Sequence, residues 1–95
     1  MACVYLISES PQGPVKVGVA NNPSSRIREL QCGNPKKLKL ADWWRFGTRD
    51  EAFVIERLIL DEMTPYRLTG EWVDADEFGM RGLILERITE RYSTS

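Results

Sequence analysis

The chain has 95 residues with 13 basic and 14 acidic side chains, 42% hydrophobic residues and no histidine. This length suffices for one compact domain with a modest core, so we expect residues 1–95 to form a single domain. The absence of histidine excludes Ser-His-Asp and Cys-His nucleophilic schemes, histidine zinc sites and histidine general bases. Any chemistry must therefore use tyrosine, lysine, arginine and carboxylates.

Charge is unevenly distributed along the sequence. Residues 1–49 carry eight basic and three acidic side chains, a net charge of +5, whereas residues 50–95 carry five arginines and eleven acidic side chains, a net charge of −6. Each lysine or arginine near a phosphate displaces a condensed counterion, so a basic half suits a polyanion partner. This holds only if folding keeps the two halves apart.

Two cysteines, Cys3 and Cys32, fit no metal-ligand spacing, and the sequence shows neither a signal peptide nor a long apolar stretch. We therefore expect a cytoplasmic protein with free thiols and no membrane partner.

The first twenty residues predict a β-hairpin. ACVYLISES and GPVKVGVA are rich in apolar and β-branched residues, and SPQGP between them is typical of a turn. A helix is predicted next, at about residues 23–32, with Ile27 and Leu30 on its core side. Its boundaries are marked by an N-cap, a proline at the first helical position and a terminal glycine: Asn22, Pro23 and Gly33.

LKLADWWRF predicts a third strand, in which adjacent tryptophans present one indole to each face and one of them lies in the core. Thr48 and Glu51 form a capping box for a second helix, which ends at about Met63, before Thr64 and Pro65. GEWV predicts a short extended segment. Asp74 with Glu77 is expected to cap a last helix, which carries four large apolar residues: Phe78, Leu85, Ile88 and Tyr92.

The order β-β-α-β-α-α predicts an α+β fold, a three-stranded antiparallel sheet flanked by helices. Within the second helix, Glu56 stands out. Its helical neighbours three and four positions away carry no charge: Ala52, Phe53, Ile59 and Leu60. A carboxylate in apolar surroundings needs a metal ion, an arginine or water as its partner. The alternative is that Glu56 borders the core and points into solvent.

Three further polar residues can meet Glu56. Tyr5 and Lys16 lie on the two strands of the predicted hairpin, and the helix that follows can bring Arg26 over the same edge. Together they offer a hydroxyl that can take a proton, a lysine, an arginine for phosphate charge and a carboxylate for a divalent cation. These groups suffice for phosphodiester hydrolysis without histidine.

At these residues the sequence resembles the GIY-YIG nuclease superfamily, and within it the branch related to an open reading frame of phage T5 and to Mug113-like domains. Val4-Tyr5 matches part of the first triplet of the motif and Lys16-Val17-Gly18 the second, while Arg26 and Glu56 match its arginine and its metal-binding glutamate. The order of VKVG, LQCGNP and GEW is also similar to that branch. The resemblance covers about residues 3–78.

Three positions depart from the family pattern. Cys3 replaces the first glycine, Lys16 replaces the second tyrosine, and Leu60 stands where relatives often carry a histidine. The identity of the general base is therefore left open.

Each position also has an ordinary structural interpretation. Tyr5 can be a sheet tyrosine with a hydrated hydroxyl, and Lys16 an edge-strand lysine that discourages aggregation. Arg26 can pair with Glu29, and Gly18 can serve close packing. Gly33 is explained by helix capping, and Trp72 by closure of the core.

The resemblance implies a magnesium- or manganese-dependent DNA endonuclease. Glu56 would hold the ion, Arg26 would stabilise phosphoryl charge, and Tyr5, its pKa lowered by Lys16 and the metal, would take a proton from water. Four basic side chains would contact the DNA: Arg28, Lys36, Lys37 and Lys39. A catalytically inactive nucleic-acid-binding module, or a protein-interaction module, is the alternative. A homodimer and a larger host or phage assembly both remain open.

Overall fold

The computed structural model describes residues 1–92; the Ser-Thr-Ser end of the chain lies outside the described residues. It has an α+β fold with three α-helices, a short 3-10 helix and a four-stranded antiparallel sheet of order β3-β1-β2-β4. The elements are β1 (Ala2–Ser8), β2 (Val15–Ala20), α1 (Pro23–Cys32), β3 (Lys39–Phe46), α2 (Arg49–Glu62), η1 (Thr64–Tyr66), β4 (Trp72–Val73) and α3 (Glu77–Tyr92).

The expected three-stranded sheet was one strand short. The segment GEWV, predicted to be extended, contributes β4, in which Val73 pairs with Val15 and Trp72 with Lys16. Only two residues of β4 pair with β2. A segment this short shows no alternation of apolar and polar residues, so the sequence did not predict that it joins the sheet. Among the described residues no strand pairs with the outer edge of β2 beyond Lys16, so this edge is open where Gly18 lies.

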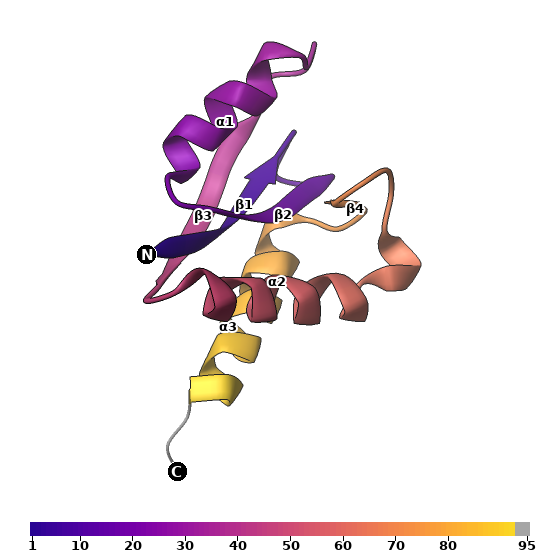
Figure 1. The fold of residues 1–95 in the computed structure, drawn as a ribbon. Coiled ribbons are helices and arrows are strands. Elements are labelled where there is room, and N and C mark those ends of the chain that lie inside the picture. The colour runs from indigo at the N-terminus through magenta and orange to yellow at the C-terminus, as the bar shows by residue number, and fades with distance from the viewer. Residues whose placement is uncertain (93–95) are drawn as a thin grey trace.

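The sheet separates one helix from the other two, and Figure 1 shows it between α1 above and α2 and α3 below. Alternate residues of β1 therefore enter different cores, and all seven residues of the strand are buried. The larger core contains Val4 and Leu6 with the apolar sides of α2 and α3. The smaller core contains Tyr5 and Ile7 and is covered by α1.

Helix α1 begins and ends as predicted. The Asn22 side chain accepts a hydrogen bond from the Ser25 N–H, and Gly33 follows the last turn. Ile27 and Leu30 are half-buried against the smaller core. This packing fixes the height of α1 above the sheet and therefore the place where Arg26 emerges.

Helix α2 also has its predicted N-cap, because the Thr48 hydroxyl accepts a hydrogen bond from the Glu51 N–H at 3.2 Å. For α3 the predicted cap was wrong. The Gly79 N–H donates to Asp76 Oδ1, two residues after Asp74, and Glu77 turns inward to accept a hydrogen bond from the buried Ser8 hydroxyl. The carboxylate nearest the first turn makes the cap, so an earlier one is not used.

Of the apolar residues predicted on α3, Phe78 and Leu85 are exposed, and the helix buries Met80 and Ile84 instead. Ile88 packs against the larger core, and Glu77 at the start of the helix is buried. The third strand behaves as predicted: Trp44 packs against the larger core, and Trp43 lies on the other face, 50% exposed. No helix within residues 1–92 is both long and apolar enough to cross a membrane.

Candidate active site

Tyr5 lies in the middle of β1, where it pairs with Gly18 of β2. Its ring crosses the sheet surface above this glycine, because any Cβ at position 18 would clash with the Tyr5 hydroxyl and ring. The Tyr5 ring can pack this closely against β2 only because residue 18 is a glycine, which has no side chain. The hydroxyl is carried toward the open edge of β2.

Arg26 reaches the same point from α1. The guanidinium lies near the Tyr5 hydroxyl, and this neighbour raises the pKa of Arg26 above its ordinary value. It also pairs with Glu29, with Nη1 3.1 Å from Oε2, so the predicted surface ion pair and the predicted site position both occur. Half-buried and charged, Arg26 offers its remaining N–H groups to an anion beside Tyr5.

Lys16 is not an edge-strand lysine. It is 9% exposed, because β4 covers this part of β2, and its Nζ lies 3.3 Å from Glu71 Oε1 and 5.9 Å from the centroid of the Trp72 ring. Trp72 also packs against the smaller core, as its predicted structural role requires. The strand pairing therefore holds a cation at the open edge.

Glu56 extends from α2, whose apolar side is buried through Ala52, Ile55 and Ile59. Burial raises the pKa of Glu56 to about 7, and the neighbouring Glu71 carboxylate adds to the rise. Arg57 and Lys16 oppose it. The expectation that Glu56 lacks a charge partner on its own helix face is met. Among the charged groups that act on it, the second carboxylate has the largest influence and cannot neutralise it.

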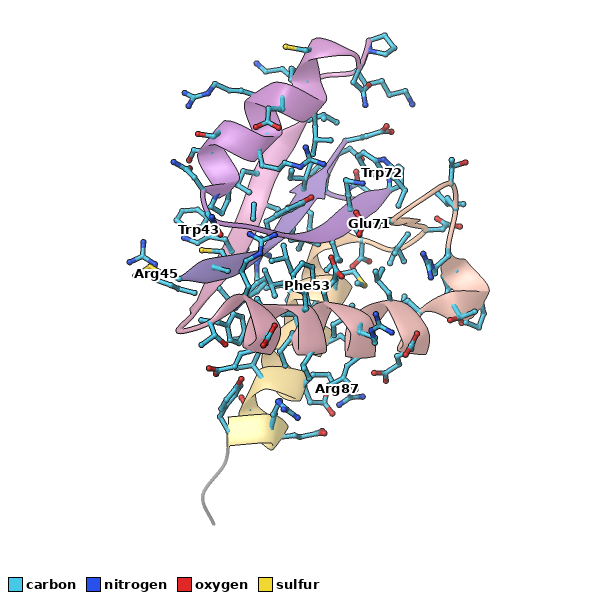
Figure 2. The ribbon with its side chains drawn as sticks, viewed as in Figure 1. Trp43, Arg45, Phe53, Glu71, Trp72 and Arg87 are labelled. Carbon is cyan, nitrogen blue, oxygen red and sulfur yellow. The ribbon has the colours of Figure 1, made fainter. Side chains whose placement is uncertain are left out.

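Glu71 was not among the site residues predicted from the sequence, where the GEW segment served only as part of the family resemblance. It pairs with Lys16, raises the pKa of Glu56 and acts electrostatically on Tyr5. Figure 2 shows it beside Trp72, at the end of the loop that leads into β4. One signal for Glu71 was available: it directly precedes Trp72, and Trp72 pairs with Lys16 in the sheet. We name the five residues the edge cluster: Tyr5, Lys16, Arg26, Glu56 and Glu71.

The expected lowering of the pKa of Tyr5 was wrong for the protein alone. Burial raises the pKa of Tyr5, and the charges of Glu71 and Glu56 raise it further, against the lowering effect of Arg26. Lys16 is engaged by Glu71 instead. The Tyr5 hydroxyl is therefore protonated at neutral pH until the negative charge beside it is compensated.

The edge cluster has two carboxylates, and within residues 1–92 no group of three or more histidine, cysteine, aspartate or glutamate residues is placed to hold a metal ion. This donor set excludes a closed site of several protein ligands. It fits Mg²⁺ or Mn²⁺, because Mg²⁺ keeps several waters and binds through one or two carboxylates together with substrate phosphate. The raised pKa of Glu56 shows that its negative charge is poorly compensated, and a bound cation would compensate it.

The predicted DNA-contacting residues are spread more widely. Arg28 is exposed on α1, and Lys37 is exposed in the loop that follows. Lys36 pairs with Glu9, its Nζ 3.4 Å from Oε1. Lys39 lies on the other side of the sheet, its Nζ 3.7 Å from Glu77 Oε1. The structure thus groups Arg28, Lys36 and Lys37 at the α1 end and separates Lys39 from them.

Comparison with known proteins identifies one family. A scan against protein families matches the T5orf172 domain over residues 2–90. Neither the curated proteins nor the solved structures give a significant match. The matched span includes every member of the edge cluster and all four strands. The chain therefore belongs to the T5orf172 domain family.

Proposed function

We propose that this domain is a DNA endonuclease that hydrolyses phosphodiester bonds with a magnesium or manganese ion. One observation carries the proposal: four elements and the loop before β4 bring a hydroxyl, two cations and two carboxylates to the open edge of β2, where Glu56 has a pKa of about 7. Membership of the T5orf172 family supports a nuclease-like or DNA-binding domain of GIY-YIG type.

Arg26 acts on the phosphate. Its guanidinium lies near the Tyr5 hydroxyl and is only half-buried, so a phosphoryl oxygen that approaches Tyr5 would also meet Arg26. Charge-assisted N–H donors placed where charge develops stabilise the transition state, and loss of one such donor costs about 10²–10³-fold in rate. Lys16 adds positive charge two residue pairs away on β2 and forms an ion pair with Glu71.

Tyr5 acts on the attacking water. A divalent cation, when bound to Glu56 and Glu71, supplies the charge compensation that the two carboxylates lack and polarises the phosphate. Burial still raises the pKa of Tyr5, but with this negative charge compensated the raising influences of Glu71 and Glu56 are removed and the lowering influence of Arg26 is left. The Tyr5 hydroxyl would then release its own proton to solvent, and the phenolate would take the proton of a water molecule in line with the phosphate.

A second candidate function is nucleic-acid binding without cleavage. It is favoured by the raised pKa of Tyr5 in the protein alone and by Leu60 in place of a histidine. In that case Arg26 and Lys16 bind phosphate, and turnover is lost. DNA binding without cleavage in Mg²⁺, Mn²⁺ or Ca²⁺ would support this candidate.

Nicking of a supercoiled plasmid with Mg²⁺ or Mn²⁺ tests the proposal. We expect Glu56→Gln and Arg26→Ala to reduce the rate by at least about 10²-fold while the fold is retained. Glu86→Gln, the same chemical change at an exposed position of α3, is the matched control and leaves the rate unchanged. Nicking that persists at the wild-type rate in Glu56→Gln would refute the assignment.

A further inference from the structure

The face of the sheet that carries Tyr5 continues beyond the edge cluster. Helix α1 covers the part of this face around Ile7, and its first residues leave the other end uncovered. There a cavity of about 250 Å³ is lined by residues of β1, β3 and the loop before α1. The lining consists of Cys3, Asn21, Asn22, Pro23, Ser24, Trp43 and Arg45. Figure 2 shows Trp43 and Arg45 at the end of the sheet opposite Glu71 and Trp72.

Trp43 is the exposed tryptophan of the chain. Half of its surface is accessible to solvent, whereas Trp44 packs against the larger core and Trp72 against the smaller one. Within residues 1–92 no cation or aromatic ring covers the Trp43 indole. Phe53, an exposed aromatic residue of α2, already has the Arg49 guanidinium 5.2 Å from its ring centroid. Core packing thus accounts for two tryptophans and leaves the flat surface of the third available.

Arg45 lies two residues along the same strand and hence on the same face as Trp43. It is exposed and forms no ion pair among the described residues, while Arg26, Arg81 and Arg87 all do. An aromatic platform next to an unpaired cation is the combination that binds one nucleotide, with the base on the ring and the phosphate on the guanidinium.

The strand register joins this surface to the edge cluster. Trp43 pairs with Tyr5, and Arg45 pairs with Cys3, the next residue on the same face of β1. Side chains of directly paired residues have Cβ atoms about 4.5–5.5 Å apart. The Tyr5 ring runs from this pair across Gly18 toward β2, so a nucleic-acid strand whose phosphate is held at Tyr5 and Arg26 reaches Trp43 by crossing β1, over two strand spacings of about 5 Å each. A base within a duplex offers no free ring surface for this contact, so the nucleotide must be unpaired.

We propose that Trp43 and Arg45 form a subsite for an unpaired nucleotide next to the phosphate bound at the edge cluster. This inference rests on the proposed function and deepens it. The substrate class is nucleic acid with a single-stranded segment, such as a gap, a flap or an end, beside the reacting bond. A uniformly paired duplex fills the edge cluster but leaves the subsite empty.

Binding measured in EDTA tests the subsite without any cleavage. Oligothymidylate and a blunt duplex of equal length are titrated into the full chain while tryptophan emission and Kd are recorded. We expect the single strand to quench emission and to bind more tightly. Trp43→Ala should abolish most of the quenching and weaken single-strand binding about 5- to 150-fold, the equivalent of about 1–3 kcal/mol for one stacked base. Arg45→Ala should weaken it less, with a lower salt dependence.

Controls separate this inference from its alternatives. Phe53→Ala removes an exposed aromatic residue elsewhere and should leave Kd unchanged, and Trp43→Phe should retain part of the affinity. If Trp43→Ala does not fold, Trp43→Leu preserves apolar surface without a π face and should show the same loss. Equal binding of single strand and duplex by wild type and Trp43→Ala would overturn the subsite. So would a dimer in sedimentation that Trp43→Ala dissociates, because a second copy would then cover the indole.

Failure of the subsite differs from failure of the proposed function. Binding and quenching are recorded in EDTA, where no cleavage occurs, so a chain that never cleaves can still confirm the subsite. Conversely, if wild type and Trp43→Ala nick plasmid and cleave flapped and gapped DNA at equal rates, the subsite is wrong while the endonuclease proposal stands.

Discussion

Replacing Glu56 with glutamine should make the free energy of unfolding depend less on pH. The raised pKa of Glu56 determines the sign of this dependence in the wild type. The pKa of this carboxyl is about 7 in the folded protein, because of burial and the neighbouring Glu71, against an ordinary value of 4.5. Between these two values the folded state holds a proton that the unfolded state has released. The free energy of unfolding therefore falls as pH rises through this window and stays low above it.

The size of the effect follows from the same two values. If the full difference applied, Glu56 alone would lower the free energy of unfolding by about 2.5 kcal/mol between about pH 5 and about pH 8. Glu56 is only partly buried, so screening by solvent reduces this to about 1–2 kcal/mol. Glutamine does not titrate. We expect Glu56→Gln to be more stable than the wild type at the higher pH by that amount, because the amide needs no compensating charge.

Urea unfolding in EDTA at the two pH values, followed by circular dichroism, measures the difference. Other titrating groups cancel between variant and wild type, and Glu86→Gln controls for the change from acid to amide at an exposed position. Identical pH dependence in wild type and Glu56→Gln would refute the reasoning, because it would mean that Glu56 is solvated and does not interact with Glu71.

Three other predictions follow from the same structure. Mg²⁺ at about 100 times its Kd should stabilise the wild type by about 2.7 kcal/mol above pH 7 and should not stabilise Glu56→Gln, as thermal unfolding would show; stabilisation of both would place the ion elsewhere. Gly18→Ala should destabilise the fold by about 1–3 kcal/mol in urea unfolding through its clash with Tyr5, whereas Gly33→Ala, with open space around it, should stay within about 0.5 kcal/mol. Ser8→Ala should cost about 1–3 kcal/mol in the same assay, because it removes a donor to a buried carboxylate; an unchanged midpoint would show that water replaces the hydroxyl.

Most elements were predictable because their signals are local. The cap at Asn22 and the stop at Gly33 lie within the helix that they bound, and the strand segments alternate over several residues. The cap of α3 was misplaced because two aspartates, Asp74 and Asp76, are equivalent in sequence. The choice between them depends on the inward turn of Glu77, which in turn depends on Ser8 of β1. Ser8 and Glu77 lie far apart in the sequence, so no local sequence pattern indicates their contact.

The site was predictable to the extent that its residues lie on regular elements. Tyr5, Lys16 and Arg26 were assigned to two strands and a helix that the structure contains, and these elements meet as the hairpin implied. Glu71 was missed because it lies in a loop, where neither periodicity nor capping constrains a side chain. The raised pKa of Tyr5 in the protein alone was not predicted either, since burial cannot be evaluated before the packing of its ring on Gly18 is known.

The central claim is that Glu56 holds a divalent cation within reach of Tyr5 and Arg26. Anomalous diffraction from a crystal soaked in Mn²⁺ tests it most directly. The account predicts a manganese peak bonded to the Glu56 carboxylate on the side of Glu71, with the Tyr5 hydroxyl and the Arg26 guanidinium facing the ion. Manganese bound only at other carboxylates, with the edge cluster formed but free of the ion, would contradict it.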